Sequence, residues 1–176
     1  MAEISEDHIK KCKDLAARSF YFVNEEKFEK TLDVAKKLEE LKYTAAFEIA
    51  GLAYLGMGEH ESAVETFECG VVQVPSLWTN WSLLGDCRSD LEDYDGANEA
   101  YGRALECSEV DVNSIRLNQA AVAAMRGNSE ESLTLLDLMT DLDYFFPSAA
   151  IRVGSLRGLG RLDEALTLAD ECLDME

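Results

Sequence analysis

The stretch GLAYLGMGEHESAVETFECG, residues 51–70, decides the fold, because a related stretch, GDCRSDLEDYDGANEAYGRA, follows it 34 residues later at 85–104. The two stretches place small or aromatic residues at the same points: Gly51 and Gly85, Ala63 and Ala97, Phe67 and Tyr101, and Gly70 and Ala104. Self-similarity at a fixed period of this size is typical of repeat architectures. The sequence therefore predicts a stack of similar units.

Weaker copies lie on both sides of this pair. The place of Ala63 and Ala97 is taken by Ser132 and Ala165 downstream and by Thr31 upstream. We therefore predict one domain, 1–176, that contains about five units. Their approximate ranges are 8–41, 44–75, 78–108, 112–143 and 146–176.

Within each unit the apolar spacing is that of a helix and does not alternate as in a strand. The second unit shows this with apolar residues at i, i+3, i+4 and i+7, namely Phe47, Ala50, Gly51 and Tyr54. A short segment with glycine or capping polar residues then separates this stripe from a second one. Each unit is thus predicted to be a helix hairpin, which makes the fold class all-α.

The small residues within these units have a physical explanation. Two helix backbones approach closely only where no bulky side chain separates them. We expect such contacts at Gly51, Ala63, Gly85 and Ala97, with aromatic side chains beside them.

The repeat resembles the tetratricopeptide repeat family, whose 34-residue unit is a helix hairpin with this order of aromatic and small positions. Pro75 ends the second unit where the family often has proline, whereas Glu109 stands at the equivalent place of the third. In the fourth unit Arg116 replaces the aromatic residue Trp81 of the third. The resemblance implies an α-solenoid of about five hairpins in a right-handed superhelical array.

The amino-acid composition argues against two classes of partner, nucleic acids and membranes. The sequence has 16 Lys and Arg against 35 Asp and Glu, which gives a formal net charge of −19. A field of that sign repels phosphate backbones and anionic lipids, so we expect no nucleic-acid partner and no membrane partner. The N-terminus lacks the apolar block of a secretory signal, and the five cysteines include no C-x-x-C pair. These features predict a cytoplasmic protein with reduced thiols.

No set of residues predicts catalysis or a metal site. The two histidines, His8 and His60, lie in different units, whereas a zinc site needs Cys and His that converge. Paired acids such as Glu130 and Glu131 open a second helix, where negative charge complements the helix dipole. We therefore predict that the protein is not an enzyme and uses no metal or other cofactor.

A surface for a partner protein or peptide remains. In stacked hairpins the first helices line a concave groove, which a ligand contacts through side chains that face away from the second helices. We expect an apolar groove with an acidic centre. Its predicted lining residues are Phe20, Val23, Glu48, Leu52, Leu55, Ser82, Asp86, Ser89, Asp90, Leu117, Ala121, Met125 and Arg157. An alternative is that the three leucines pack between adjacent first helices.

Two functions remain open. The first is a non-enzymatic module that binds a partner peptide or helix in the groove, as a chaperone or adaptor does. The alternative is an oligomerising scaffold, or a subunit of a larger complex, that uses the C-terminal helix. For that alternative we expect apolar residues without a neighbour in the last hairpin, namely Val153, Leu156, Leu166, Ala169, Leu173 and Met175. A homo-oligomer formed through this helix would cover them.

Overall fold

The computed structural model describes residues 6–139 and 144–174, and within these ranges the chain forms ten α-helices and no β-strand. The helices are α1 (Glu6–Asn24), α2 (Phe28–Glu40), α3 (Ala46–Gly56), α4 (His60–Gln73), α5 (Trp78–Asp90), α6 (Tyr94–Leu105), α7 (Val112–Met125), α8 (Ser129–Asp137), α9 (Phe145–Gly158) and α10 (Leu162–Asp174). None of these helices combines the length and the apolar character needed to cross a membrane.

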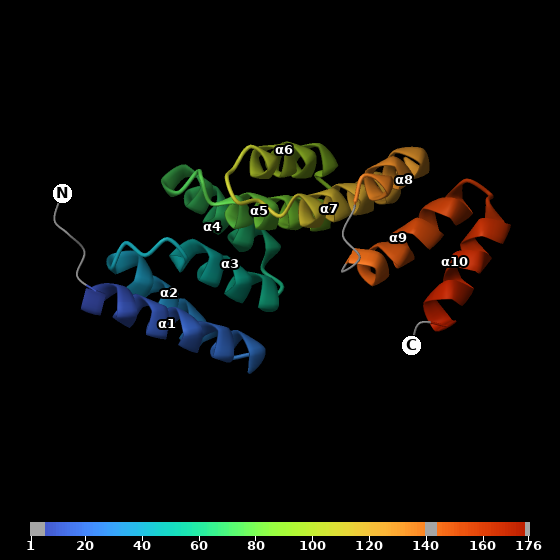
Figure 1. Ribbon diagram of the computed structural model, residues 1–176. Helices are drawn as coiled ribbons and strands as arrows, with labels where there is room; N and C mark the ends of the chain where they lie inside the picture. Colours follow the sequence, from blue (N-terminus) through green and yellow to red (C-terminus); the bar gives the residue numbers. More distant parts are fainter. Residues whose placement is uncertain (1–5, 140–143, 175–176) are drawn as a thin grey trace.

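Consecutive helices pair into five hairpins, from α1 with α2 to α9 with α10. In each of the first four hairpins, the second helix also contacts the first helix of the next hairpin. The first helices of successive hairpins contact one another as well. Figure 1 shows the hairpins following an arc, with α6, α8 and α10 on the outer side of α5, α7 and α9. The prediction of an all-α solenoid of helix hairpins is confirmed.

The turn inside every hairpin is three residues long, and its middle residue has a positive φ angle. These middle residues are Glu26 (54°), Gly58 (75°), Glu92 (62°), Gly127 (82°) and Gly160 (73°). Glycine adopts this left-handed conformation without a Cβ clash, whereas glutamate does so at a cost of roughly 1–2 kcal/mol. The sequence predicted short turns here, but it did not reveal that two glutamates take the glycine conformation.

Small residues lie where the helices of a hairpin meet, as predicted. A Cβ atom on Gly51 would lie 2.3 Å from Cζ of Phe67, and one on Gly85 would lie 2.4 Å from Cε1 of Tyr101. Phe67 and Tyr101 are buried, so their rings cannot move aside into solvent. The aromatic rings of α4 and α6 therefore pack directly on the backbones of α3 and α5.

The core continues between hairpins. Phe67 and Val71 of α4 belong to the same buried cluster as Leu84 and Cys87 of α5. Asn80 is also fully buried, yet neither its side-chain nitrogen nor its side-chain oxygen has a hydrogen-bond partner. A buried amide without a hydrogen-bond partner costs stability at this interface.

The last hairpin corrects one expectation. Leu156, expected to lack a neighbour, is 6% exposed because it packs in a cluster with Leu133 of α8. Val153, also expected to lack a neighbour, packs against the same cluster and, like Ala169, is half-buried. Leu166 and Leu173 are 65% and 70% exposed, as expected. Met175 lies outside the described residues.

Candidate partner-binding face

Hydrogen bonds between successive first helices show which predicted residues lie together. Thr79 Oγ1 on α5 donates to Glu48 Oε2 on α3 at 3.3 Å. Asn118 Nδ2 on α7 donates to Asp86 Oδ1 on α5 at 2.8 Å. Side chains from α3, α5 and α7 therefore meet along one surface, which we call the first-helix face and define by the thirteen predicted lining residues.

The predicted residues differ in their accessibility. Four are exposed, namely Phe20, Asp90, Met125 and Arg157. Eight are half-buried, namely Val23, Glu48, Leu52, Leu55, Asp86, Ser89, Leu117 and Ala121. Ser82 is buried, with Nδ2 of Asn118 at 3.5 Å from its Oγ. Ser82 therefore contacts the neighbouring helix and is not available to a ligand.

The three half-buried leucines were predicted either to contact a partner or to pack between adjacent helices, and the structure separates them. Leu55 packs against the buried cluster that α4 and α5 share, which favours packing within the array as its role. Leu52 and Leu117 retain partial exposure. Met125 is 63% exposed, although Ser89 Oγ donates to its sulfur at 3.8 Å. The apolar surface left for a partner is thus centred on α3 and α7.

Asp86 occupies the middle of the first-helix face and is held from two sides. Tyr101 Oη on α6 donates to Asp86 Oδ1 at 2.8 Å, and the amide of Asn118 donates to the same oxygen. Burial raises the pKa of Asp86 above its usual value, the hydrogen bond from Tyr101 opposes this, and the nearby charge of Asp90 raises the pKa further. The network fixes the position of the carboxylate between three helices.

Sequence reasoning selected Asp86 but missed both of its partners. Asn118 lies 32 residues after Asp86, close to one repeat period, so a search for polar pairs at that separation would have found it. Tyr101 was assigned only a packing role, which its buried ring also fulfils.

Glu48 gives the face a second half-buried carboxylate. Burial raises its pKa, and the hydrogen bond from Thr79 partly opposes that rise. Arg88, the basic residue of α5, bonds instead to Glu68 Oε1 at 2.9 Å and to the carbonyl oxygen of Gly96. It therefore does not neutralise the carboxylates of the face, and the centre of the face is acidic.

The remaining predicted residues lie at the two ends of the array. Phe20 and Val23 belong to α1 and Arg157 to α9, and these helices lie at opposite ends of the arc of first helices in Figure 1. A single partner would have to follow the full arc to contact both ends.

The described residues contain no group of three or more His, Cys, Asp or Glu side chains placed to hold a metal ion. Cys87 is buried, and burial is the main reason that its pKa is raised to about 12, so it stays a thiol at neutral pH. A thiolate, not a thiol, is the nucleophile in cysteine chemistry.

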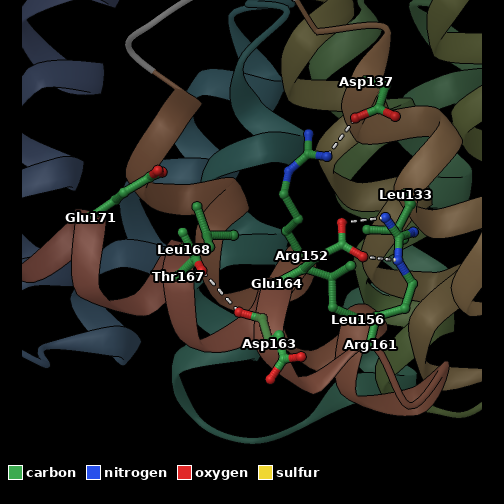
Figure 2. A pocket seen from close by; sticks show the side chains of 10 residues that line it. All are labelled: Leu133, Asp137, Arg152, Leu156, Arg161, Asp163, Glu164, Thr167, Leu168 and Glu171. Atoms are coloured by element: carbon green, nitrogen blue, oxygen red, sulfur yellow. Dashed lines mark hydrogen bonds and ion pairs between the residues drawn. The ribbon is translucent and has the colours of Figure 1, made fainter.

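A cleft that the sequence did not predict lies among α8, α9 and α10 (Figure 2). Its volume is about 490 Å³, and its apolar part includes Leu133 and Leu156. Arg152 on α9 pairs with Asp137 on α8 at 2.5 Å, and Arg161 forms two hydrogen bonds with Glu164. Because both arginines already have carboxylate partners, the cleft offers no unpaired cation to an anionic ligand.

The fold and a short stretch of the sequence are similar to those of known proteins. No protein-family model matches the chain. A 54-residue segment is 44% identical to the heat-shock protein cognate (HSC) co-chaperone sgt12 of Aspergillus fumigatus, and this match covers 31% of the present chain and 16% of the co-chaperone. The crystal structure of MamA protein superposes with a TM-score of 0.72 at 16% identity, over 93% of this chain and 90% of MamA. These similarities support a tetratricopeptide-type helical repeat fold.

Proposed function

We propose that this protein is a non-enzymatic interaction module that binds a segment of a partner protein on the first-helix face. The observation that carries the proposal is that the hydrogen bonds Thr79–Glu48 and Asn118–Asp86 join α3, α5 and α7, so that side chains of these three first helices lie next to one another. The helical-repeat fold and the short similarity to a co-chaperone support an adaptor or chaperone role.

The chemistry of the face defines the segment it would accept. Exposed or half-buried apolar side chains on α3 and α7, including Leu52, Leu117 and Met125, would receive apolar side chains of the partner. Asp86 and Asp90 on α5 would lie beside a basic side chain in its middle. We therefore propose an extended or helical segment that is apolar with a central Lys or Arg. The acidic composition and scattered cysteines fit a cytoplasmic location for this interaction.

The test is affinity capture from the native cell, comparing wild type with Leu52→Glu/Leu117→Glu. Both leucines are only half-buried, so the helices should form as in the wild type, while two added charges should remove the captured partner. Val72→Glu, a change at a 79% exposed position of α4, is the matched control and should capture the partner as the wild type does.

Circular dichroism checks that all three proteins have the same helix content. If the double variant retained its partner at the wild-type level with intact helices, binding on the first-helix face would be excluded.

The scaffold alternative would use α10 and not this face. It predicts a concentration-dependent dimer or larger species in sedimentation, and a monomer at high concentration would contradict it.

A further inference from the structure

The α10 helix carries a row of exposed leucines that the fold does not use. Leu162, Leu166 and Leu173 are 56%, 65% and 70% exposed. They follow one another at i, i+4 and i+11, which places them on one side of the helix. We call these three residues the α10 stripe. Ala165 of the same helix is buried, so the stripe lies beside the face that packs within its own hairpin.

The internal repeat shows what covers such positions elsewhere. Leu166 corresponds to Val64 on α4 and to Leu133 on α8, and Leu173 corresponds to Val71 on α4. Val64 and Val71 pack with Leu84 and Cys87 of α5, and Leu133 packs with Leu156 of α9. In these hairpins the next first helix covers the position. Leu166 and Leu173 therefore occupy positions that the next first helix covers in the second hairpin, and for Leu166 also in the fourth.

Charge selects the kind of helix. The α10 helix contains five acids, namely Asp163, Glu164, Asp170, Glu171 and Asp174, and no Lys or Arg. Glu164 and Glu171 lie on the side that lines the cleft with α8 and α9, and Asp163 and Asp170 adjoin the stripe at i−3 and i+4 from Leu166. Glu164 pairs with Arg161, which precedes the helix. Binding of a helix to the stripe would therefore be favoured by Lys or Arg next to the apolar side chains of that helix, where they would lie near Asp163 and Asp170.

A second copy of this chain fits the stripe poorly. Pairing α10 with α10 would bring the two sets of acids together. Pairing it with α1 would present Asp14, Arg18 and Tyr21, the counterparts of Asn80, Leu84 and Cys87 in the third unit. These α1 side chains are exposed, and two of the three are charged. Neither helix supplies the apolar surface that α5 supplies to α4.

We propose that the α10 stripe binds an amphipathic α-helix of another protein, with apolar residues along one side and Lys or Arg beside them. This helix occupies on α10 the place that α5 occupies on α4. The site is separate from the first-helix face, so the two proposals stand or fall independently.

The experiment measures binding of a labelled helical peptide of about 18 residues, made of Leu, Ala and Lys, by fluorescence anisotropy. A second peptide with Glu in place of Lys is the charge control. We expect the lysine peptide to bind the wild type at least about tenfold more tightly than the glutamate peptide does. Leu166→Glu/Leu173→Glu should weaken the lysine peptide by a similar factor, because both residues are exposed and their change leaves the fold intact.

Two matched variants locate the site. Val72→Glu adds one carboxylate at another exposed apolar position, and this variant should bind the lysine peptide within a factor of two to three of the wild type. Asp163→Asn/Asp170→Asn should reduce the preference for lysine over glutamate. The proposal would be overturned if the wild type and the leucine variant bound the lysine peptide with equal affinity. It would also be overturned if the leucine variant and Val72→Glu lost affinity for this peptide to the same extent. A dimer in sedimentation that the leucine variant abolishes would overturn it too, since a second copy would then be the occupant.

Discussion

At the scale of single residues, Asp86 is the side chain that best connects fold and proposed function. Its carboxylate receives hydrogen bonds from Tyr101 on α6 and Asn118 on α7, and it lies in the middle of the first-helix face. Burial makes the charged form less favourable, which is why the pKa of Asp86 is raised despite the hydrogen bond from Tyr101.

The raised pKa predicts a pH-dependent difference between wild type and Asp86→Asn. A carboxyl whose pKa is higher in the folded state binds more protons there than in the unfolded state, so its contribution to stability falls as pH rises through this interval. The asparagine oxygen can still accept the hydrogen bond from Tyr101. The stability of Asp86→Asn relative to wild type should therefore increase as the pH rises above about 4, the ordinary pKa of an aspartate.

Urea unfolding of both proteins across this range measures the difference, in which most effects of the other acids cancel. A difference in the free energy of unfolding that stays constant with pH would show that the pKa of Asp86 is the same in the folded and unfolded states.

At the scale of helices, the second and third hairpins each depend on the contact between a glycine and an aromatic ring. Gly85 of α5 lies under the buried ring of Tyr101 on α6, and Gly51 of α3 lies under Phe67 on α4. Gly102, on the same helix as Tyr101, has open space where a Cβ atom would lie. The same substitution at Gly85 and at Gly102 therefore separates a packing effect from helix propensity.

Gly85→Ala should destabilise the protein by about 1–3 kcal/mol, because the added methyl group would overlap the ring of Tyr101. Gly102→Ala should stabilise it by about 0.5–1 kcal/mol, since alanine loses less conformational freedom in a helix and meets no neighbour. Thermal or urea unfolding compares the two variants with wild type. Stabilisation by both substitutions would contradict the close contact between α5 and α6.

At the scale of the whole molecule, charge repulsion opposes the compact array. The formal net charge is −19. Ion pairs among the described residues, such as Arg126–Asp95 and Arg103–Glu106, are exposed at the carboxylate and contribute little stability each. Salt screens both the repulsion among the excess acids and the attraction within these pairs. Because the repulsion is the larger of the two, screening should stabilise the folded protein.

Raising sodium chloride from about 0.02 M to 0.5 M shortens the screening length to a few ångströms, and Tm should rise by roughly 2–5 °C. Calorimetry or circular dichroism measures this shift. Chloride is used because sulfate would also strengthen apolar burial by exclusion from the surface. A lower Tm at high salt would mean that the ion pairs outweigh the repulsion.

The solenoid was predictable because its signal is local and repeated. The contact of Gly85 with Tyr101 lies within one hairpin, so a 34-residue comparison exposes it. The burial of Ser82 and of Leu156 was not predictable in this way. Asn118 of the next hairpin covers Ser82, and Leu133 of the previous hairpin packs against Leu156. The left-handed Glu92 was also missed, because the chemical preference at that turn is for glycine.

Helical periodicity, turn spacing and the order of small and aromatic residues are properties of short segments, and so the sequence by itself determined the hairpins and their succession. The exposure of a given first-helix residue, the partners of Asp86 and the bare leucines of α10 depend on which neighbouring hairpin lies over each position. Only the tertiary structure decided these, because residues about one repeat apart come together when hairpins stack.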